Sequence, residues 1–151
     1  MKLRAYFVVN QYIAGIHAGI QGAHAMGEMF IKYLPRKNKA AAIMQDWLRD
    51  DKTIIVLEGG YQSRLIDLSI LLEKTQNTYP FATFREEVDA LNGAMTAVAV
   101  VLPEYMYNPE RNEDGTVVNT LVSEEGNVLH RYTQHEKDVI DHIKSLRLKG
   151  S

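Results

Sequence analysis

Two histidines and a glutamine at helical spacing are the residues of this chain best suited to chemistry. His17, Gln21 and His24 stand four and three positions apart, which places them on one face of a helix. That face begins one turn after an expected strand, where open α/β sheets place their ligands. Imidazole and amide groups there predict an acid–base or oxygen-binding surface. The alternative interpretation is a polar helix edge whose histidines are satisfied by backbone carbonyls.

The same spacing is poorly suited to a metal ion. Histidines share one ion readily when they are three or four positions apart, whereas His17 and His24 are two helical turns apart, about 10 Å along the axis. The chain has no cysteine, so thiolate metal sites, cysteine nucleophiles and disulfides are excluded. We therefore expect neither a bound metal nor a cofactor.

Glycines are concentrated on the same expected helix. Gly15, Gly19, Gly22 and Gly27 lie in it, and each costs a helix interior about 1 kcal/mol relative to alanine. Close approach of the helix to a sheet or to a ligand would offset this cost. We therefore place Gly19 and Gly22 beside Gln21 in a substrate-binding surface.

An acidic segment between two expected strands supplies a second candidate. Glu86, Glu87 and Asp89 follow Arg85 there, and Glu86 would supply a carboxylate base facing the helix across a cleft. A solvated loop is the alternative that such a charge run favours. The chain contains no G-x-x-x-x-G-K-[ST], G-x-G-x-x-G or G-x-S-x-G, so nucleotide-loop and serine-hydrolase motifs are absent.

Cations gather where the glycine-rich helix is expected to end. Lys32, Arg36, Lys37 and Lys39 lie close together, and such a patch can hold a phosphate backbone. We take Lys37 and Lys39 as the candidate contacts, with a solubilising linker as the more common alternative. With 17 Lys+Arg against 19 Asp+Glu and a net charge of −2, the chain is not a strongly basic nucleic-acid binder, although a local patch fits this total.

The elements that would position these residues follow from the hydrophobic pattern. Short apolar runs predict strands, stripes at helical spacing predict helices, and a T-x-x-E capping box begins the last helix at Thr133. Alternation of the two favours an α/β domain with a mostly parallel sheet and helices on both faces. A chain of 151 residues fits one domain, with residues 1–103 as its scaffold and 104–151 as an appendage. The expected strands are 3–9, 53–57, 81–88 and 96–102, the last central and covered on both faces; the expected helices are 13–34, one from about residue 40, 61–76 and one after Thr133; and 117–122 with 128–132 form a hairpin.

Two blocks of the chain carry a family pattern. The first, I-H-A-G-I-Q-G-A-H-A, runs from Ile16 to Ala25, and the second runs from Arg85 to Pro103. Together they resemble the type 2 (archaeal/eukaryotic-type) peptidyl-tRNA hydrolases, whose first helix carries G-K-x-A-A-Q-x-x-H-A and whose later block reads R-D-A-G-x-T-Q and then G-T-x-T-V-L-A-I-G-P. The corresponding residues are Ala18 (as a small residue), Gln21, His24, Ala25, Arg85, Gly93, Thr96 and Pro103. The style of the sequence also resembles that of small phage-encoded proteins.

The resemblance implies a three-layer fold with a four-stranded mixed sheet flanked by helices, to which the hairpin and last helix would be added. It also implies a shallow cleft facing RNA and an ester, with Gln21, Arg85 and Thr96 in the substrate-binding set. The family's catalytic lysine falls on His17, its aspartate nearest to Glu86 and its threonine on Ala94, while no T-Q pair follows Arg85. A histidine at neutral pH is shorter than a lysine and largely uncharged, which weakens capture of phosphate.

These patterns predict a divergent peptidyl-tRNA hydrolase-like protein that lacks the ordinary hydrolase chemistry and acts in binding or regulation. One alternative is an active ester hydrolase in which His17 or His24 is the general base and Glu86 orients it. Another is an oligomer formed through the hairpin and the last helix. The expected partners are tRNA or another protein, or a second copy of the chain, with no membrane; the expected location is cytoplasmic.

Overall fold

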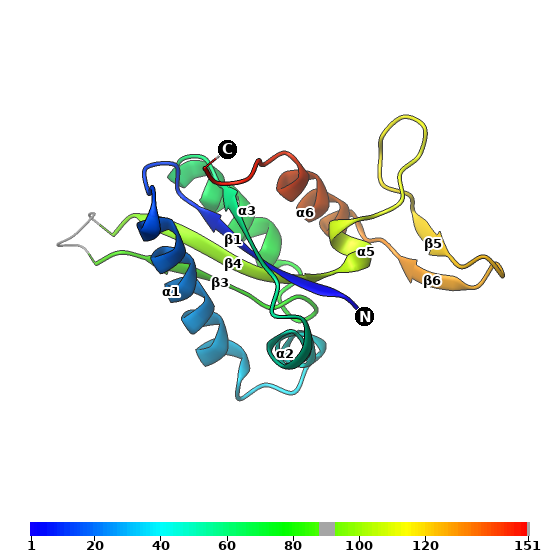
Figure 1. Ribbon diagram of the computed structural model, residues 1–151. Coiled ribbons are helices and arrows are strands. Elements are labelled where there is room, and N and C mark those ends of the chain that lie inside the picture. Colours follow the sequence, from blue (N-terminus) through cyan, green and yellow to red (C-terminus); the bar gives the residue numbers. More distant parts are fainter. Residues whose placement is uncertain (88–92, 151) are drawn as a thin grey trace.

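Four strands form one mixed sheet through the middle of the protein (Figure 1). The computed structural model describes residues 1–87 and 93–150. The strands are β1 (Leu3–Val9), β2 (Ile54–Glu58), β3 (Phe81–Arg85) and β4 (Met95–Pro103), in the order β2-β1-β4-β3. β1 pairs with β2 in parallel, and β4 is antiparallel to both β1 and β3. The expected α/β class and four-stranded mixed sheet are therefore confirmed.

The prediction of a mostly parallel sheet is wrong, because only one of the three neighbouring pairs is parallel. The cause lies in the connection from β3 to β4. A parallel neighbour needs a crossover of a dozen or more residues, whereas fewer than that separate Arg85 from Met95. The chain therefore returns antiparallel. Val88, which was expected to end the third strand, lies outside the described residues.

Burial along the strands follows their place in the sheet. Every residue of β4 is buried, and in β1 only Arg4 is exposed. This confirms the prediction that 96–102 is a central strand covered on both faces. The edge strands β2 and β3 are more exposed, but the C-terminal residues protect part of β2: Leu148 forms an antiparallel bridge with Leu57, and the Lys149 amide donates to the Val56 carbonyl at 2.9 Å.

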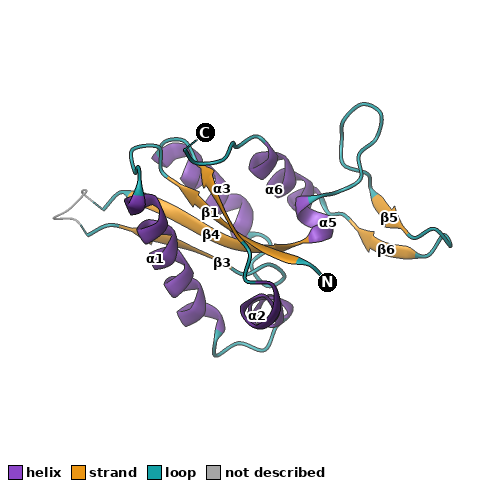
Figure 2. Cartoon of the chain, in the orientation of Figure 1, coloured by secondary structure: helices purple, strands orange, loops and turns teal. Residues whose placement is uncertain are grey.

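Helices cover both faces of the sheet (Figure 2). α1 (Ile16–Tyr33) and α2 (Lys39–Asp46), which continues into the π-helical turn η1 (Trp47–Asp51), lie on one face; α3 (Gln62–Glu73), the short α5 (Glu104–Tyr107) and α6 (Gln134–Lys144) lie on the other. Successive residues of β1 show this alternation, because Phe7 lies under Gly22 of α1 while Val8 approaches Gly59 before α3. In the part of the chain that the structure describes, no helix has the length and apolar character needed to cross a membrane.

The first helix begins later than the hydrophobic pattern predicts. It starts at Ile16 rather than Ile13 because Gly15 adopts φ +60, a left-handed backbone that favours glycine and interrupts a helix. α1 ends at Tyr33, and Pro35 follows shortly after it, as expected from the missing amide of proline. At the last helix the capping box is confirmed: the Glu136 amide donates to the Thr133 hydroxyl, and the Thr133 amide donates to the Glu136 carboxylate.

Residues 104–150 contribute to the same core as the sheet. Met106 of α5 and Val139 of α6 are buried, and α6 packs against α3. The expected hairpin is present as β5 (Thr120–Val122) and β6 (Val128–Arg131), which project from the body in Figure 1. The excursion after Pro103 begins with α5 and is then exposed from Glu110 to Thr116.

Candidate functional site

The residues expected to carry chemistry on α1 divide between the sheet and the solvent. Gln21 is buried and accepts a hydrogen bond of 2.7 Å from the Thr96 hydroxyl to its Oε1. Thr96 lies where the pairing of β3 with β4 shifts register, as in a β-bulge, because Phe84 pairs with Ala97 and Arg85 with Met95. The two motif blocks, 75 positions apart at this contact, therefore meet in a buried bond.

The two histidines of the predicted site are exposed and do not face each other across a closed cavity. His24 stacks on Phe84 of β3, with ring centroids 4.5 Å apart and the planes inclined by 13°. His17, the second residue of α1, is open to solvent. Among the described residues, no group of three or more His, Asp and Glu side chains is arranged to hold a metal ion.

The acidic candidate Glu86 is not joined to either histidine. Its amide donates to the Ala94 carbonyl at 3.0 Å, but within residues 1–87 and 93–150 no hydrogen bond or ion pair links its carboxylate to His17 or His24. Arg85 is exposed and donates to the Gly93 carbonyl at 3.2 Å. The second acidic candidate, Asp89, lies outside the described residues.

The glycines of α1 have different roles. A Cβ at Gly22 would lie 2.2 Å from Phe7 Cδ2, so this glycine allows the helix to approach the sheet. The expected close approach is therefore present at Gly22, which faces the sheet rather than a ligand. Gly19 and Gly27 have open space around the position of a Cβ, so close approach within the chain does not explain them.

A cleft opens beside these residues, where β1 ends and β4 begins. Its volume is about 390 Å³, and its lining includes Asn10, Tyr12, Tyr61 and Gln62. Asn10 is 5% exposed, and its amide donates to the Met95 carbonyl at 3.1 Å while its Oδ1 accepts from the Tyr12 amide at 3.0 Å. The Gln62 Oε1 accepts from the Met95 amide at 2.6 Å. Asn10 therefore ties the loop after β1, and Gln62 ties the start of α3, to the first residue of β4.

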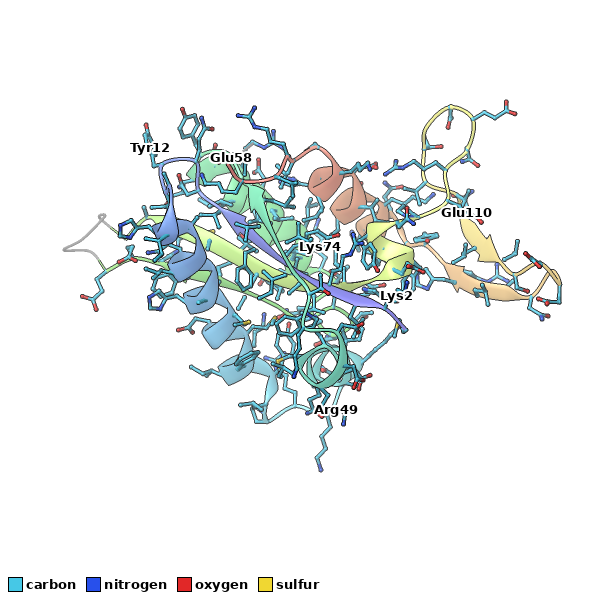
Figure 3. The ribbon with its side chains drawn as sticks, viewed as in Figure 1. Lys2, Tyr12, Arg49, Glu58, Lys74 and Glu110 are labelled. Atoms are coloured by element: carbon cyan, nitrogen blue, oxygen red, sulfur yellow. The ribbon has the colours of Figure 1, made fainter. Side chains whose placement is uncertain are left out.

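Two tyrosine rings form the rim of this cleft. Tyr12 is 82% exposed and projects outward in Figure 3; its ring centroid is 5.2 Å from that of Tyr61, at an angle of 49°. Exposed rings in contact offer apolar faces to which a planar group can stack. We call this region, defined by Asn10, Tyr12, Gln21, Tyr61 and Thr96, the carboxyl-end site, because it lies where the parallel strands β1 and β2 end.

Arg36, Lys37 and Lys39 form a basic linker after α1, which is expected to bind RNA. It lies at the other end of α1 from His17. The helix has 18 residues and is therefore about 27 Å long. Lys37 is exposed, while the Lys39 Nζ donates to the Tyr105 hydroxyl at 3.3 Å and lines a second cavity. The structure thus brings Gln21 together with Thr96 but separates Lys37 and Lys39 from both.

The second cavity contains a buried network that the sequence interpretation missed. Glu136, 5% exposed, accepts hydrogen bonds on Oε2 from the Tyr79 hydroxyl and from His130 Nε2, the latter at 2.9 Å. The Tyr79 hydroxyl also lies 2.9 Å from the Tyr105 hydroxyl. The capping box signals Glu136 in the sequence, but the contact with Tyr79 spans 57 positions and has no local signal. The Glu136 carboxylate therefore caps α6 and also binds Tyr79, in the connection from α3 to β3.

Burial makes the tyrosines of this network hard to ionise. Desolvation raises the pKa of Tyr79 far above its usual range, and the hydrogen bond with Glu136 raises it further. Desolvation, followed by the nearby Glu136 charge, raises the pKa of Tyr132 to about 12. Both hydroxyls therefore stay protonated at neutral pH and act as donors, Tyr79 to Glu136 and Tyr132 to the Tyr105 carbonyl at 2.6 Å.

Comparison with known proteins does not place the chain in a family, because no family model and no curated protein sequence matches it. The resemblance to type 2 peptidyl-tRNA hydrolases therefore stays a prediction, as does the phage-like character of the sequence. What the protein does has to be inferred from the chemistry of its own surfaces, above all from the carboxyl-end site.

Proposed function

We propose that this chain is a divergent peptidyl-tRNA hydrolase-like protein that binds RNA at the carboxyl-end site without hydrolysing an ester there. The observation that carries the proposal is the buried bond between Gln21 and Thr96. Each residue comes from one of the two blocks that resemble the family, and a contact between them is what a common scaffold would need. The four-stranded mixed sheet with helices on both faces supports the same fold.

The surroundings of His17 support binding over catalysis. General base catalysis needs a histidine within hydrogen-bond reach of an orienting group, and in the described part of the chain His17 has no carboxylate partner. The exposed rings of Tyr12 and Tyr61 instead suit the stacking of unpaired bases, which tolerates sequence variation because every base has an aromatic face. The ligand that this surface fits best is a single-stranded RNA end, such as the acceptor end of a tRNA.

The test is turnover and binding measured on the same preparation. Peptidyl-tRNA is incubated with the protein at several pH values, and release of the peptide is compared with that of His17→Ala. The proposal predicts no release above this control, together with saturable binding of the tRNA. Turnover that His17→Ala abolishes would contradict it and would establish the hydrolase that uses His17, His24 and Glu86.

The basic linker allows a second measurement on the same RNA. If the RNA extends along α1, replacing Lys37 and Lys39 by alanine lowers the slope of log affinity against log salt by about one to two, since each lost phosphate contact contributes about 0.7–0.9. The matched control variant is Lys2→Ala/Lys52→Ala, which removes two lysines outside the linker. An unchanged slope would remove Lys37 and Lys39 from the RNA contact.

Self-association is the second candidate, and exposed apolar side chains favour it. Val122, Val128 and Leu129 are 47–61% exposed on the projecting hairpin. On α1, Ile16 and Ile31 are 70–78% exposed on the face away from the sheet. Exposed apolar side chains become candidates for an interaction site where they form a common patch.

Light scattering of Leu129→Glu and Ile31→Glu tests each surface separately. An assembly that dissociates in one variant identifies the interface, and a wild-type chain that scatters as a monomer contradicts self-association. Removal of everything after Glu104 is unsuitable as a test, because that segment supplies the buried residues Met106 and Val139.

A further inference from the structure

A cavity at the opposite end of the sheet from the carboxyl-end site gathers positive charge. Its volume is about 360 Å³, and its walls come from the start of α2, the connection from α3 to β3, the end of β6 and the first turn of α6. Three permanently charged cations line it: Lys39, Lys74 and Arg131. We call it the basic cavity. Lys74 is labelled in Figure 3, well away from Tyr12.

The cations of the basic cavity lack carboxylate partners. Within residues 1–87 and 93–150, no Asp or Glu oxygen lies within 4.0 Å of the charged groups of Lys39, Lys74 or Arg131. The one carboxylate in the lining is Glu136, whose oxygens are occupied by Tyr79, His130 and the Thr133 amide. Three cations and one carboxylate leave a formal charge of +2. The negative charge is held inside the protein, and the positive charges are left for a ligand.

Further donors surround these cations. Thr78 and Thr133 lie in the lining, and the Thr133 hydroxyl, which accepts from the Glu136 amide, keeps its own proton to donate. The Thr75 hydroxyl is already used, because it donates to the Leu72 carbonyl. α6 begins at the same wall with 11 residues, so the amides of Gln134 and His135 have no acceptor within their own helix. A helix start of this length favours a negative charge, and it does so here beside three side-chain cations.

We propose that the basic cavity binds the phosphate group of a small phosphomonoester. A monoester carries about −1.5 to −2 charges at neutral pH, which complements the formal +2 of the lining, whereas a backbone phosphodiester carries one. The volume falls within the usual range of about 300–1,000 Å³ for small-molecule sites and exceeds what a bare phosphate requires, so it leaves room for the organic group of an ester. Lys39 is shared with the lysines tested for RNA contact, but the proposal does not rest on RNA binding at the carboxyl-end site.

The experiment is calorimetric titration of the full chain in a phosphate-free buffer. The probes are inorganic phosphate, phenyl phosphate and, as the ligand without phosphate, phenol. Lys74→Gln/Arg131→Gln removes two exposed cations of the cavity, and the matched control Lys2→Gln/Lys52→Gln removes two exposed cations outside the lining. Circular dichroism verifies that every variant is folded.

The proposal predicts that both phosphate probes bind competitively and that phenol does not bind. Affinity falls by about tenfold or more in the Lys74/Arg131 double variant, since charge-assisted bonds to phosphate are lost. It falls by less than about twofold in Lys2→Gln/Lys52→Gln, since outlying charges are screened. No saturable binding of either phosphate probe at millimolar concentration overturns the proposal, as does equal weakening in both variants. Displacement of phenyl phosphate by a tRNA lacking its terminal phosphate also overturns it, because an RNA backbone would then be the occupant.

Discussion

At both ends of the sheet, polar side chains are engaged in hydrogen bonds within the protein, but the groups left exposed differ. At the carboxyl-end site, amide side chains are used up in holding the backbone: Asn10 and Gln62 both bond to Met95, and the tyrosine rings remain exposed. In the basic cavity a carboxylate is used up, and the cations remain exposed. One end therefore offers uncharged aromatic faces, and the other offers positive charge.

This difference changes what a net charge of −2 means. The average conceals a division along the length of α1, with histidines and glycines near one end of the sheet and lysines near the other. Two ends so unlike are suited to different ligand chemistries. The predictions below test whether each end depends on the polar contacts that distinguish it.

The largest effect is expected at the basic cavity, on replacement of Glu136 by leucine. The change leaves the buried Tyr79 hydroxyl, His130 and the Thr133 amide without their acceptor. Loss of a buried network of this kind lowers the free energy of unfolding by about 2–4 kcal/mol. Urea denaturation measures it, with the exposed Glu113→Leu as control. A loss equal to that of the control would mean that Glu136 does not organise this end of the sheet.

A smaller effect is expected where α1 approaches the sheet. Gly22→Ala places a Cβ 2.2 Å from Phe7 Cδ2, and overpacking of a core costs about 1–3 kcal/mol. Gly19→Ala and Gly27→Ala, which meet open space, should stabilise the same helix by up to about 1 kcal/mol. Thermal unfolding of the three variants distinguishes the sites. The same sign in all three would contradict the separate roles assigned to these glycines.

The bond between the two motif blocks is tested by Thr96→Val, which removes the hydroxyl donor and keeps the shape. Gln21 Oε1 then loses its buried partner, at a cost of about 1–2 kcal/mol. A double-mutant cycle with Gln21→Leu isolates the bond, because the loss from Thr96→Val should shrink when the acceptor is already absent. Strictly additive losses would show that the two residues do not interact.

The smallest effect concerns pH and His142, where α6 faces α3. Burial, and then the nearby charge of Arg64, lower the pKa of His142 below its usual 6.5. The unfolded chain thus binds a proton more readily than the folded one, so this group lowers stability as the pH falls below 6.5 and has no effect above it. His142→Gln should flatten the fall in unfolding free energy just below that pH. An identical profile for wild type and variant would contradict the assignment.

The features that the sequence predicts well are those determined by neighbouring residues. The first strand has the expected bounds Leu3–Val9, the capping box of Thr133 and Glu136 is present, and the apolar run from Ala97 to Leu102 lies in a central strand. Where the prediction is wrong, the cause is the direction of strand pairing or a backbone torsion angle. Sheet direction depends on the length of the connection after Arg85, and the start of α1 depends on the φ of Gly15.

The functional surfaces are less predictable because they join distant segments. Gln21 is identified by its helical spacing with His17 and His24, whereas Thr96 is identified only through the family resemblance. Nothing local links an amide on a helix to a hydroxyl on a strand 75 positions later. The contact of Tyr79 with Glu136 has no pattern at all. Hydrophobic periodicity shows which face of an element is buried, but it does not show which polar groups will meet there.

The most direct test of RNA binding at the carboxyl-end site is the affinity for fluorescently labelled tRNA, measured by anisotropy at fixed salt. Tyr12→Ala/Tyr61→Ala removes the two exposed rings, and Ile70→Ala, an exposed apolar side chain on α3, is the control. Stacking contributes about 1–3 kcal/mol per base, so the account predicts that the dissociation constant rises about tenfold or more in the double variant and stays unchanged in the control. An affinity that survives the loss of both rings would contradict it.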